Sequence, residues 1–293
     1  MNRFNTPLRY PGGKGKLTDY FKDIVTLNDL ENGTYIEPYA GGAGIAINLL
    51  MGGNVSNIVI NDADPAVYSF WKVATENTDE LTEMIRNVEL SLDEWDNQKR
   101  ISKDRNSSRI ERGFSTLYLN RTNRSGILAA GPIGGRTQSG TYTLGVRFNK
   151  NDLINRINEI GNKSDHIEVL CMDGSYFLSE YLANYDIDNT LVYIDPPYYD
   201  KGSLLYMNHY KEKDHVELAE TIKGLDHKWI LSYDNVQSIR DIYSWTVPLE
   251  FRMYYSAYST KLGNELFFKS AYLKIPEESY PVKSTSTLDI EAI

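Results

Sequence analysis

The segment from residue 34 to residue 62 constrains the fold most strongly. An apolar stretch at 34–39 runs into a Gly-rich loop, an apolar helical stretch follows at 45–51, and a second apolar stretch at 57–60 ends in Asn61-Asp62. Strand, loop, helix and strand in this order are typical of a βαβ unit, whose two strands lie parallel in one sheet. The segment therefore predicts an α/β fold with a parallel sheet.

Further segments extend this pattern on both sides of an interruption. Helical patterns run from Pro65, a favourable first-turn residue, to about Val88. More strands are expected at about 167–171, 191–194, 229–232, 251–255 and 266–273. In the interruption, helical patterns are expected at 110–119 and 151–160, and a loop with a hairpin in the Gly-, Ser- and Thr-rich stretch 131–145.

These patterns divide the chain into three parts. Residues 1–88 and 160–275 are expected to form one discontinuous α/β domain, interrupted by an insertion at 89–159. The polar tail at 276–293 is expected to be mobile.

The charge of the chain is distributed unevenly. The net charge of −9 argues by itself against a nucleic-acid partner. Residues 97–156, however, contain 12 Lys and Arg against 3 Asp and Glu, which gives this window +9 and the remainder of the chain −18. A basic segment in an acidic chain is typical of a local polyanion contact, although a solvated helical face would also explain it.

Several classes of protein are disfavoured by what the sequence lacks. The one cysteine, Cys171, excludes an internal disulfide framework and fits a reducing cytoplasm. None of the four His residues has a partner at metal-site spacing, so no zinc site is expected. The N-terminus has no apolar signal-peptide region, and no apolar stretch is long enough to span a bilayer. We therefore expect a cytoplasmic protein that binds neither metal nor membrane.

The tetrapeptide Asp195-Pro196-Pro197-Tyr198 is the most specific motif. It follows the apolar strand at 191–194, and ligands of parallel sheets bind beyond the carboxyl ends of the strands. The Asp195 carboxylate and the Pro196 carbonyl could accept both N–H groups of one amine, while the two prolines fix the backbone. Tyr198 offers a flat face on which a base could stack. A Pro-rich turn at the end of a strand is the alternative.

Two Gly-containing segments accompany this motif. Glu37-Pro38-Tyr39-Ala40-Gly41-Gly42-Ala43-Gly44 follows a strand, and its small residues would let a nucleoside ligand approach the backbone. Asp62 follows about twenty residues later, at the usual place for a carboxylate that binds ribose hydroxyls; Asp64 is the substitute, and a helix N-cap is the alternative role. The segment Leu8-Arg9-Tyr10-Pro11-Gly12-Gly13-Lys14 lacks the spacing of a P-loop.

Taken together, these residues resemble the Dam-like DNA adenine N6-methyltransferases (D12 class, alpha group). The similarity spans residues 8 to about 270, and the order of cofactor loop, insertion and catalytic motif is that of the alpha group. The matching segments are Tyr10-Pro-Gly-Gly-Lys14, Glu37 to Gly44, Asn61-Asp62, Tyr118-Leu-Asn-Arg-Thr-Asn-Arg-Ser-Gly126, Asp195 to Tyr198, Ser232-Tyr-Asp234 and Gly263-Asn-Glu265-Leu266.

The resemblance implies a Rossmann-like methyltransferase sheet with one antiparallel strand and an inserted, mainly helical target-recognition domain. It implies transfer of a methyl group from S-adenosylmethionine to an adenine flipped out of double-stranded DNA, with S-adenosylhomocysteine as product and no metal. Such an enzyme is expected as a monomer or weak dimer. It would serve beside a cognate restriction endonuclease, or alone as an orphan or phage methylase.

The resemblance also assigns roles to individual residues. Those expected to hold the target adenine are Asp195, Pro196, Pro197 and Tyr198. Those expected at the cofactor are Tyr10, Lys14, Glu37, Pro38, Ala40, Gly41, Gly42, Gly44, Asp62 and Asp173. Those expected at the DNA are Arg121, Asn123, Arg124 and Arg136. The stretch 129–147 differs from the corresponding hairpin of the GATC-modifying members, so GATC is not carried over as the target.

Other functions remain open at this stage. Cytosine N4, an adenine in RNA and a protein glutamine would present a similar amine, although glutamine methylation usually goes with Asn in place of Asp195. An inactive nucleic-acid-binding homologue is the alternative outside enzymes. C5-cytosine methylation is rejected because it needs a nucleophilic thiol, and Cys171 lies within an expected strand with no Pro beside it.

Overall fold

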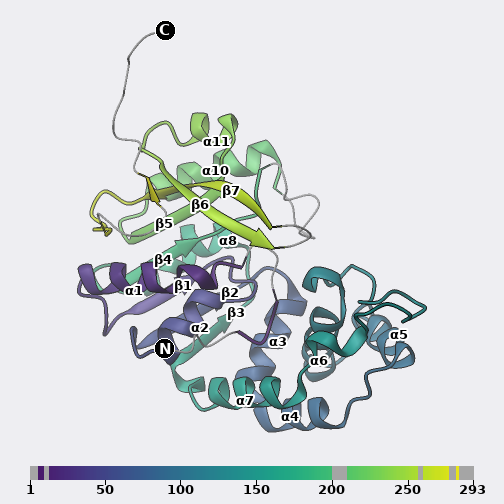
Figure 1. Ribbon diagram of the computed structural model, residues 1–293. Helices are drawn as coiled ribbons and strands as arrows, with labels where there is room; N and C mark the ends of the chain where they lie inside the picture. The colour runs from purple at the N-terminus through teal and green to yellow at the C-terminus, as the bar shows by residue number, and fades with distance from the viewer. Residues whose placement is uncertain (1–5, 10–12, 200–209, 257–259, 277–281, 284–293) are drawn as a thin grey trace.

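An eight-stranded mixed sheet runs through the protein (Figure 1). The computed structural model describes residues 6–9, 13–199, 210–256, 260–276 and 282–283. The strand order is β3-β2-β1-β4-β5-β7-β6-β8. The strands are β1 (Thr34–Glu37), β2 (Asn57–Asn61), β3 (Ile167–Leu170), β4 (Thr190–Ile194), β5 (Lys228–Asp234), β6 (Leu249–Ser256), β7 (Thr260–Lys269) and β8 (Val282–Lys283). The α/β fold predicted from the sequence is confirmed.

The direction of the strands changes at β7. Strands β1 to β5 pair in parallel, whereas β7 pairs antiparallel with both β5 and β6. The order reverses between β1 and β4, because β2 and β3 lie on one side of this pair and β5 on the other. Such a reversal leaves a crevice at the carboxyl ends of the two strands, where α/β proteins bind their ligands.

Two residues of the tail assigned to 276–293 belong to the sheet. Val282–Lys283 form β8, which pairs antiparallel with β6. The prediction of a mobile tail is therefore wrong for these two residues. Residues 277–281 and 284–293, on which the rest of that prediction falls, lie outside the described residues.

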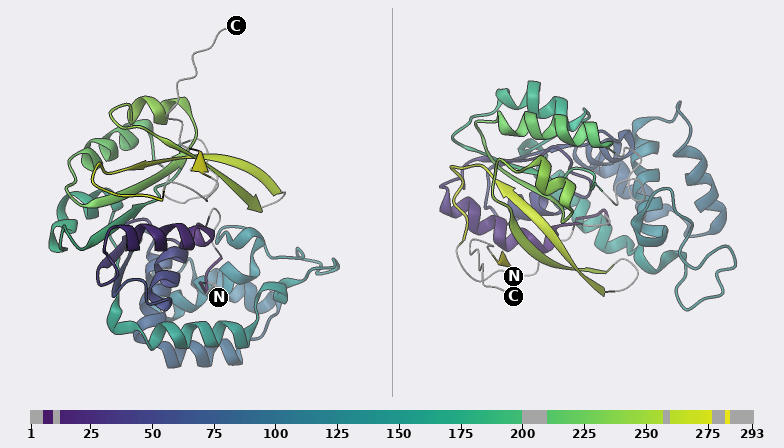
Figure 2. Two further views of the ribbon diagram at one scale, coloured as in Figure 1. Left: turned by 60° about the vertical axis from the view of Figure 1, so that its left-hand side comes forward. Right: turned by 90° about the horizontal axis from the view of Figure 1, so that it is seen from above.

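Helices cover both faces of the sheet (Figure 2). Side chains that alternate along the central strands enter two separate cores: Tyr35 and Tyr193 pack on the side of α1 and α2, and Ile36 and Val192 on the side of α10 and α11. The α-helices are α1 (Thr18–Leu27), α2 (Gly44–Met51), α3 (Pro65–Glu76), α4 (Thr78–Asn87), α5 (Leu92–Ile101), α6 (Arg109–Thr122), α7 (Lys150–Gly161), α8 (Gly174–Tyr176), α10 (Glu212–Lys223) and α11 (Gln237–Ile242).

The remaining helical segments are short. They are the 3₁₀ turns η1 (Gly15–Leu17), η2 (Arg124–Gly126), η3 (Leu144–Arg147), η4 (Ser164–His166) and η6 (Leu182–Asn184), and one π-helical turn, η5 (Phe177–Tyr181). In the described part of the chain, no helix has the length and apolar character that crossing a membrane would require.

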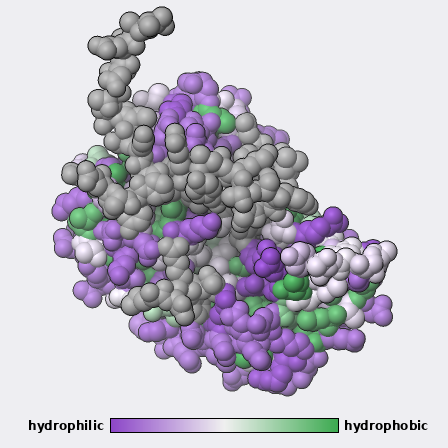
Figure 3. All heavy atoms as spheres, in the orientation of Figure 1, coloured by the Kyte–Doolittle hydropathy of each residue, from purple (hydrophilic) through white to green (hydrophobic). Residues whose placement is uncertain are grey.

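Helices α4 to α7 lie together beside the sheet (Figure 1), and their outer face is mainly hydrophilic over α4 and α7 (Figure 3). Helix α6 packs against α3, and α7 packs against α4. Buried side chains of α6 and α7, such as Leu117 and Ile157, belong to the same core as α1 and α2. The segment 89–159 thus shares its core with α3 and α4, and α7 runs across the boundary expected at residue 159.

The loop at 131–145 is not a hairpin. Residues 131–145 are all described and contain no strand; their one β-contact is an isolated bridge between Pro132 and Asn123. The side chain of Gln138 organises the loop instead, because its Nε2 donates to the carbonyls of Ile133 and Gly135 and its Oε1 accepts from the Leu144 N–H. These side-chain contacts take backbone groups that a hairpin would pair with each other.

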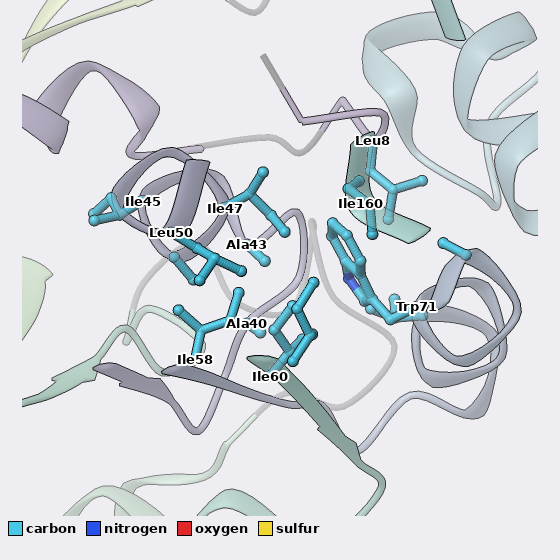
Figure 4. Close-up of a cluster of buried hydrophobic side chains, with 14 of the residues drawn as sticks. Leu8, Ala40, Ala43, Ile45, Ile47, Leu50, Ile58, Ile60, Trp71 and Ile160 are labelled. Carbon is cyan, nitrogen blue, oxygen red and sulfur yellow. The ribbon is translucent and has the colours of Figure 1, made fainter. Parts of the chain in front are cut away.

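Trp71 joins the core to the Gly-rich loop (Figure 4). Its side chain is fully buried, and its Nε1 donates to the Gly41 carbonyl at 2.9 Å. We expect Trp71→Phe to lower the free energy of unfolding by about 2 kcal/mol, since it leaves that buried carbonyl without a donor and opens a small cavity. Chemical denaturation checks this. Tyr176→Phe, at a 56% exposed site, is the control and should change stability by less than about 0.5 kcal/mol.

Candidate active site

A cavity of about 720 Å³ opens at the carboxyl ends of β1 to β4. The residues after each strand contribute to its wall, and Lys14 closes it from the N-terminal segment. The lining residues that the sequence analysis assigned are Lys14, Glu37, Ala40, Gly41, Gly42, Gly44, Asp62, Arg121, Asp173, Asp195 and Pro197. This volume fits a ligand of nucleoside size.

The loop between β1 and α2 is held by a carboxylate from the next strand. Asp62 Oδ2 accepts from the Gly41 N–H at 2.8 Å, and Asp62 Oδ1 accepts from the Asp64 N–H at 2.9 Å. Gly41 has φ of +48°, a conformation that favours glycine. Burial raises the pKa of Asp62 to about 6. Asp64, not Asp62, is the N-cap of α3, which resolves the alternative left open by the sequence.

Glu37 places a buried carboxylate on the cavity wall. Glu37 is the last residue of β1, and its Oε1 accepts from the Ala46 N–H at the start of α2, at 3.0 Å. Burial raises the pKa of Glu37 to about 8, and the hydrogen bond from Ala46 only partly opposes this. A buried acid without a cationic partner favours the protonated form. The site can therefore stabilise a positively charged group brought by a ligand.

Asn61 binds together the loops that follow three strands. Its Nδ2 donates to the carbonyls of Pro38 at 2.8 Å and Met172 at 3.0 Å, and its Oδ1 accepts from the Met172 N–H at 3.1 Å. The side chain is fully buried. Asn61 is part of a segment that resembles the family, but the sequence analysis assigned it no role. The sequence does not show that Pro38 and Met172 lie close together in the fold.

Asp195 receives donors from two distant segments. Ser232 Oγ on β5 donates to Asp195 Oδ1 at 2.6 Å and is itself 2.8 Å from the Tyr193 hydroxyl. Lys14 Nζ lies 3.4 Å from both oxygens of Asp195. Asp195 therefore enters the cavity as a carboxylate in a defined orientation, with a cation beside it.

Tyr198 is fixed by its hydroxyl. This group donates to Glu265 Oε1 on β7 at 2.6 Å and accepts from Lys14 Nζ, which also lies 5.0 Å from the Tyr198 ring centre. Burial raises the pKa of Glu265, and nearby Lys14 opposes the shift. The loop after Tyr198 is anchored by Asp234, whose Oδ1 accepts from the Tyr199 N–H at 3.0 Å.

The remaining assigned residues of the site differ in position. Asp173 lines the cavity, but its Oδ1 also accepts from the N–H groups of Ser175 and Tyr176, as a helix N-cap does. Pro38, Pro196 and Tyr198 are not among the residues that line the cavity, and Pro196 is buried. Tyr10 lies outside the described residues.

Two of the four residues expected at the DNA have interior roles. Asn123 is fully buried; its Nδ2 donates to the carbonyls of Ile127 and Leu128, and its Oδ1 accepts from Trp95 Nε1. This amide has no group left for a base or a phosphate, so its expected DNA contact is corrected to a structural role. Arg121 is also buried, and it donates through Nε to the Pro7 carbonyl at 2.6 Å and through Nη2 to the Thr6 carbonyl.

The other two arginines expected at the DNA are exposed. Arg136 pairs with Asp96 at 2.7 Å and lies 5.3 Å from the ring centre of Trp95. Arg124 of η2 and Arg147 of η3 are exposed, and no acidic partner is seen for either among the described residues. Arg147 also lines the cavity, a position that its place in the basic segment did not reveal.

Comparison with known protein families identifies the family of this chain. The profile of the D12 class N6 adenine-specific DNA methyltransferases matches residues 10–259. The chain belongs to this family. It is an adenine-specific DNA methyltransferase, as the resemblance implied, and the matched region includes both the Gly-rich loop and Asp195 to Tyr198.

Individual relatives are distant from this methyltransferase. The Type II methyltransferase M.MjaIII of Methanocaldococcus jannaschii is 24% identical over 241 residues, which cover 75% of this chain and 80% of the relative. A structure described as a candidate RNA methyltransferase from Pyrococcus horikoshii superposes with a TM-score of 0.41 and 11% identity, over 89% of this chain and 83% of that one. A candidate class I S-adenosylmethionine-dependent methyltransferase from Listeria monocytogenes gives a TM-score of 0.36 and 11% identity, over 90% and 63%. Neither superposition is close enough to support an argument.

Proposed function

We propose that this methyltransferase binds S-adenosylmethionine in the cavity and transfers its methyl group to N6 of an adenine turned out of duplex DNA. One observation carries the proposal: Asp195 lies on the wall of the same cavity as Glu37 and the Gly-rich loop. A donor bound by the loop and an amine held by Asp195 would then meet in one cavity.

The cavity has polar groups that suit this cofactor. Glu37 would face the ammonium group of its methionine portion, and residues 41–44 line the cavity with small side chains that let a ligand come close. Asn48 Oδ1 and Thr6 Oγ1 belong to lining residues, are buried, and have no hydrogen-bond partner among the described residues. Buried polar atoms of this kind are normally satisfied, so two unpartnered oxygens on lining residues support a polar ligand there.

The amine of adenine needs acceptors, because its lone pair is delocalised into the ring. Asp195 and the Pro196 carbonyl would accept its two N–H groups, and thereby turn the lone pair towards the methyl group. The bound cofactor supplies an electrophilic methyl group on a sulfonium. Methyl transfer would leave N6 with one proton to lose, and this proton would pass to solvent while Asp195 holds the other N–H group. Tyr198, held by Glu265, would stack on the base.

A mapping experiment tests this function. The protein is expressed in a host that lacks adenine methylation, and modified bases are located across the genome. We expect N6-methyladenine at one short recurring sequence. Methylation at cytosine N4, or modified adenine in RNA alone, would contradict the proposal. The same map would give the recognition sequence.

The DNA would lie over the exposed arginines near the cavity. The segment 89–159 would recognise the target sequence. We expect replacement of Arg124 and Arg147 by Gln to weaken DNA binding and to reduce the salt slope of log K by about 0.9 for each phosphate that the variant no longer neutralises. Titration at several salt concentrations checks this. Lys22→Gln, at an exposed position of α1, is the matched control. An unchanged slope in the double variant would place the DNA elsewhere.

A further inference from the structure

Glu265 is a buried carboxylate in the active site to which neither the sequence nor the family match gives a role. It is 2% exposed and lies on β7, opposite Asp234 of β5. Its Oε1 accepts from the Tyr198 hydroxyl at 2.6 Å and lies 3.3 Å from Lys14 Nζ. Its Oε2 is buried and has no hydrogen-bond partner among the described residues. A buried carboxylate oxygen nearly always has a hydrogen-bond partner, so an unpartnered one calls for an explanation.

Lys14 stands between two carboxylates at nearly equal distances. Its Nζ is 3.4 Å from both oxygens of Asp195 and 3.3 Å from Glu265 Oε1. Asp195 Oδ1 also accepts from Ser232. In this arrangement Lys14 lies beside both oxygens of Asp195, so an adenine amine would compete with its ammonium for the carboxylate.

We propose that Glu265 is a positioning residue of the transfer reaction, which fixes Tyr198 and takes the ammonium of Lys14 away from Asp195 when the adenine amine binds there. The unpartnered Oε2 of Glu265 provides the additional acceptor for the Lys14 ammonium. Asp195 is then free to accept from N6, while Lys14 remains paired. This inference rests on the proposed function, because it concerns the amine that Asp195 would hold.

The charges of the three groups explain why this exchange is needed. Positive charge develops on N6 as the methyl group is transferred, and an unneutralised ammonium close to N6 would oppose it. With Glu265 ionised, Lys14 is balanced by one carboxylate and Asp195 keeps its charge for the amine. With a neutral amide in place of Glu265, Asp195 is the counter-ion that remains for Lys14 among these groups.

A double-mutant cycle tests the inference. We expect Glu265→Gln, which keeps size and shape, to slow single-turnover methyl transfer by at least tenfold or so at saturating cofactor and DNA. In the Lys14→Met background, where no ammonium competes for Asp195, the same substitution should change the rate by less than about threefold. A purely structural role of Glu265 would give equal effects in both backgrounds.

A binding measurement gives a second readout. DNA with adenine at the mapped target position is compared with DNA that carries purine there, which lacks the amino group. We expect Glu265→Gln to reduce the ratio of the two affinities relative to the wild type, with binding of the purine DNA unchanged. Equal effects in the two backgrounds, together with an unchanged affinity ratio, would overturn the inference. If the wild type itself transfers no methyl group to N6, the proposed function fails instead.

Discussion

Asp195→Ala is expected to lower methyl transfer to DNA by about a thousandfold or more, while the affinity for S-adenosylmethionine stays within about twofold of the wild type. The carboxylate points into the cavity, is oriented by Ser232, and carries the charge that a partly positive N6 needs. The substitution does not change the Gly-rich loop, Glu37 or Asp62, which are the groups expected to bind the cofactor. Transfer of labelled methyl groups measures the rate, and calorimetry measures cofactor binding.

Two further variants sharpen this experiment. Asp195→Asn keeps one acceptor oxygen but loses the charge, so it should retain more activity than Asp195→Ala and less than the wild type. Glu180→Ala removes an exposed carboxylate of η5 and should leave both rate and binding unchanged. Normal transfer by Asp195→Ala would show that Asp195 is not the catalytic carboxylate and would require another acceptor for the amine.

The sheet could be predicted from the sequence because its central strands are short, apolar and bounded by turns. The strand at 191–194 is buried on both faces, so it is an uninterrupted apolar stretch. Where side chains compete with the backbone, the prediction was wrong: Gln138 organises a loop in place of the expected hairpin. The pairing of β8 with β6 was also missed, because two residues carry no periodicity.

The site was predictable wherever a motif lies along one segment. Glu37, the Gly-rich loop and Asp195 are recognised from adjacent residues and do line one cavity. Contacts between distant segments gave no such signal: Ser232, Glu265 and Asn61 act through partners 37, 67 and 111 positions away. These residues could be noted as similar to the family, but only the fold shows what they touch.

The same limit applies to the predicted DNA contacts. The resemblance assigned Arg121 and Asn123 to the DNA. In the fold, the last turns of α6 are buried, and both side chains satisfy backbone carbonyls of neighbouring loops. A polar residue can serve the interior when backbone groups there lack partners, and charge counts along a sequence do not separate this role from a surface role.

The pH dependence of cofactor binding should report on Glu37. Burial raises its pKa to about 8, so the free protein holds this group protonated at neutral pH. An ammonium group bound beside it favours the carboxylate, and binding therefore releases a proton. We expect the affinity for S-adenosylmethionine to rise about tenfold between pH 6.5 and 7.5 and to level off above pH 8. Calorimetry in buffers of different ionisation enthalpy measures both affinity and proton release.

Glu37→Gln separates this effect from other titrations. The amide cannot lose a proton, so its affinity should be lower at pH 7.5 and nearly independent of pH over the same interval. Asp62 titrates lower, since burial raises its pKa only to about 6, and the chosen interval lies above that value. An equal slope in the wild type and in Glu37→Gln would show that another group releases the proton. The ammonium of the cofactor would then lie away from Glu37, and its orientation in the cavity would have to be reversed.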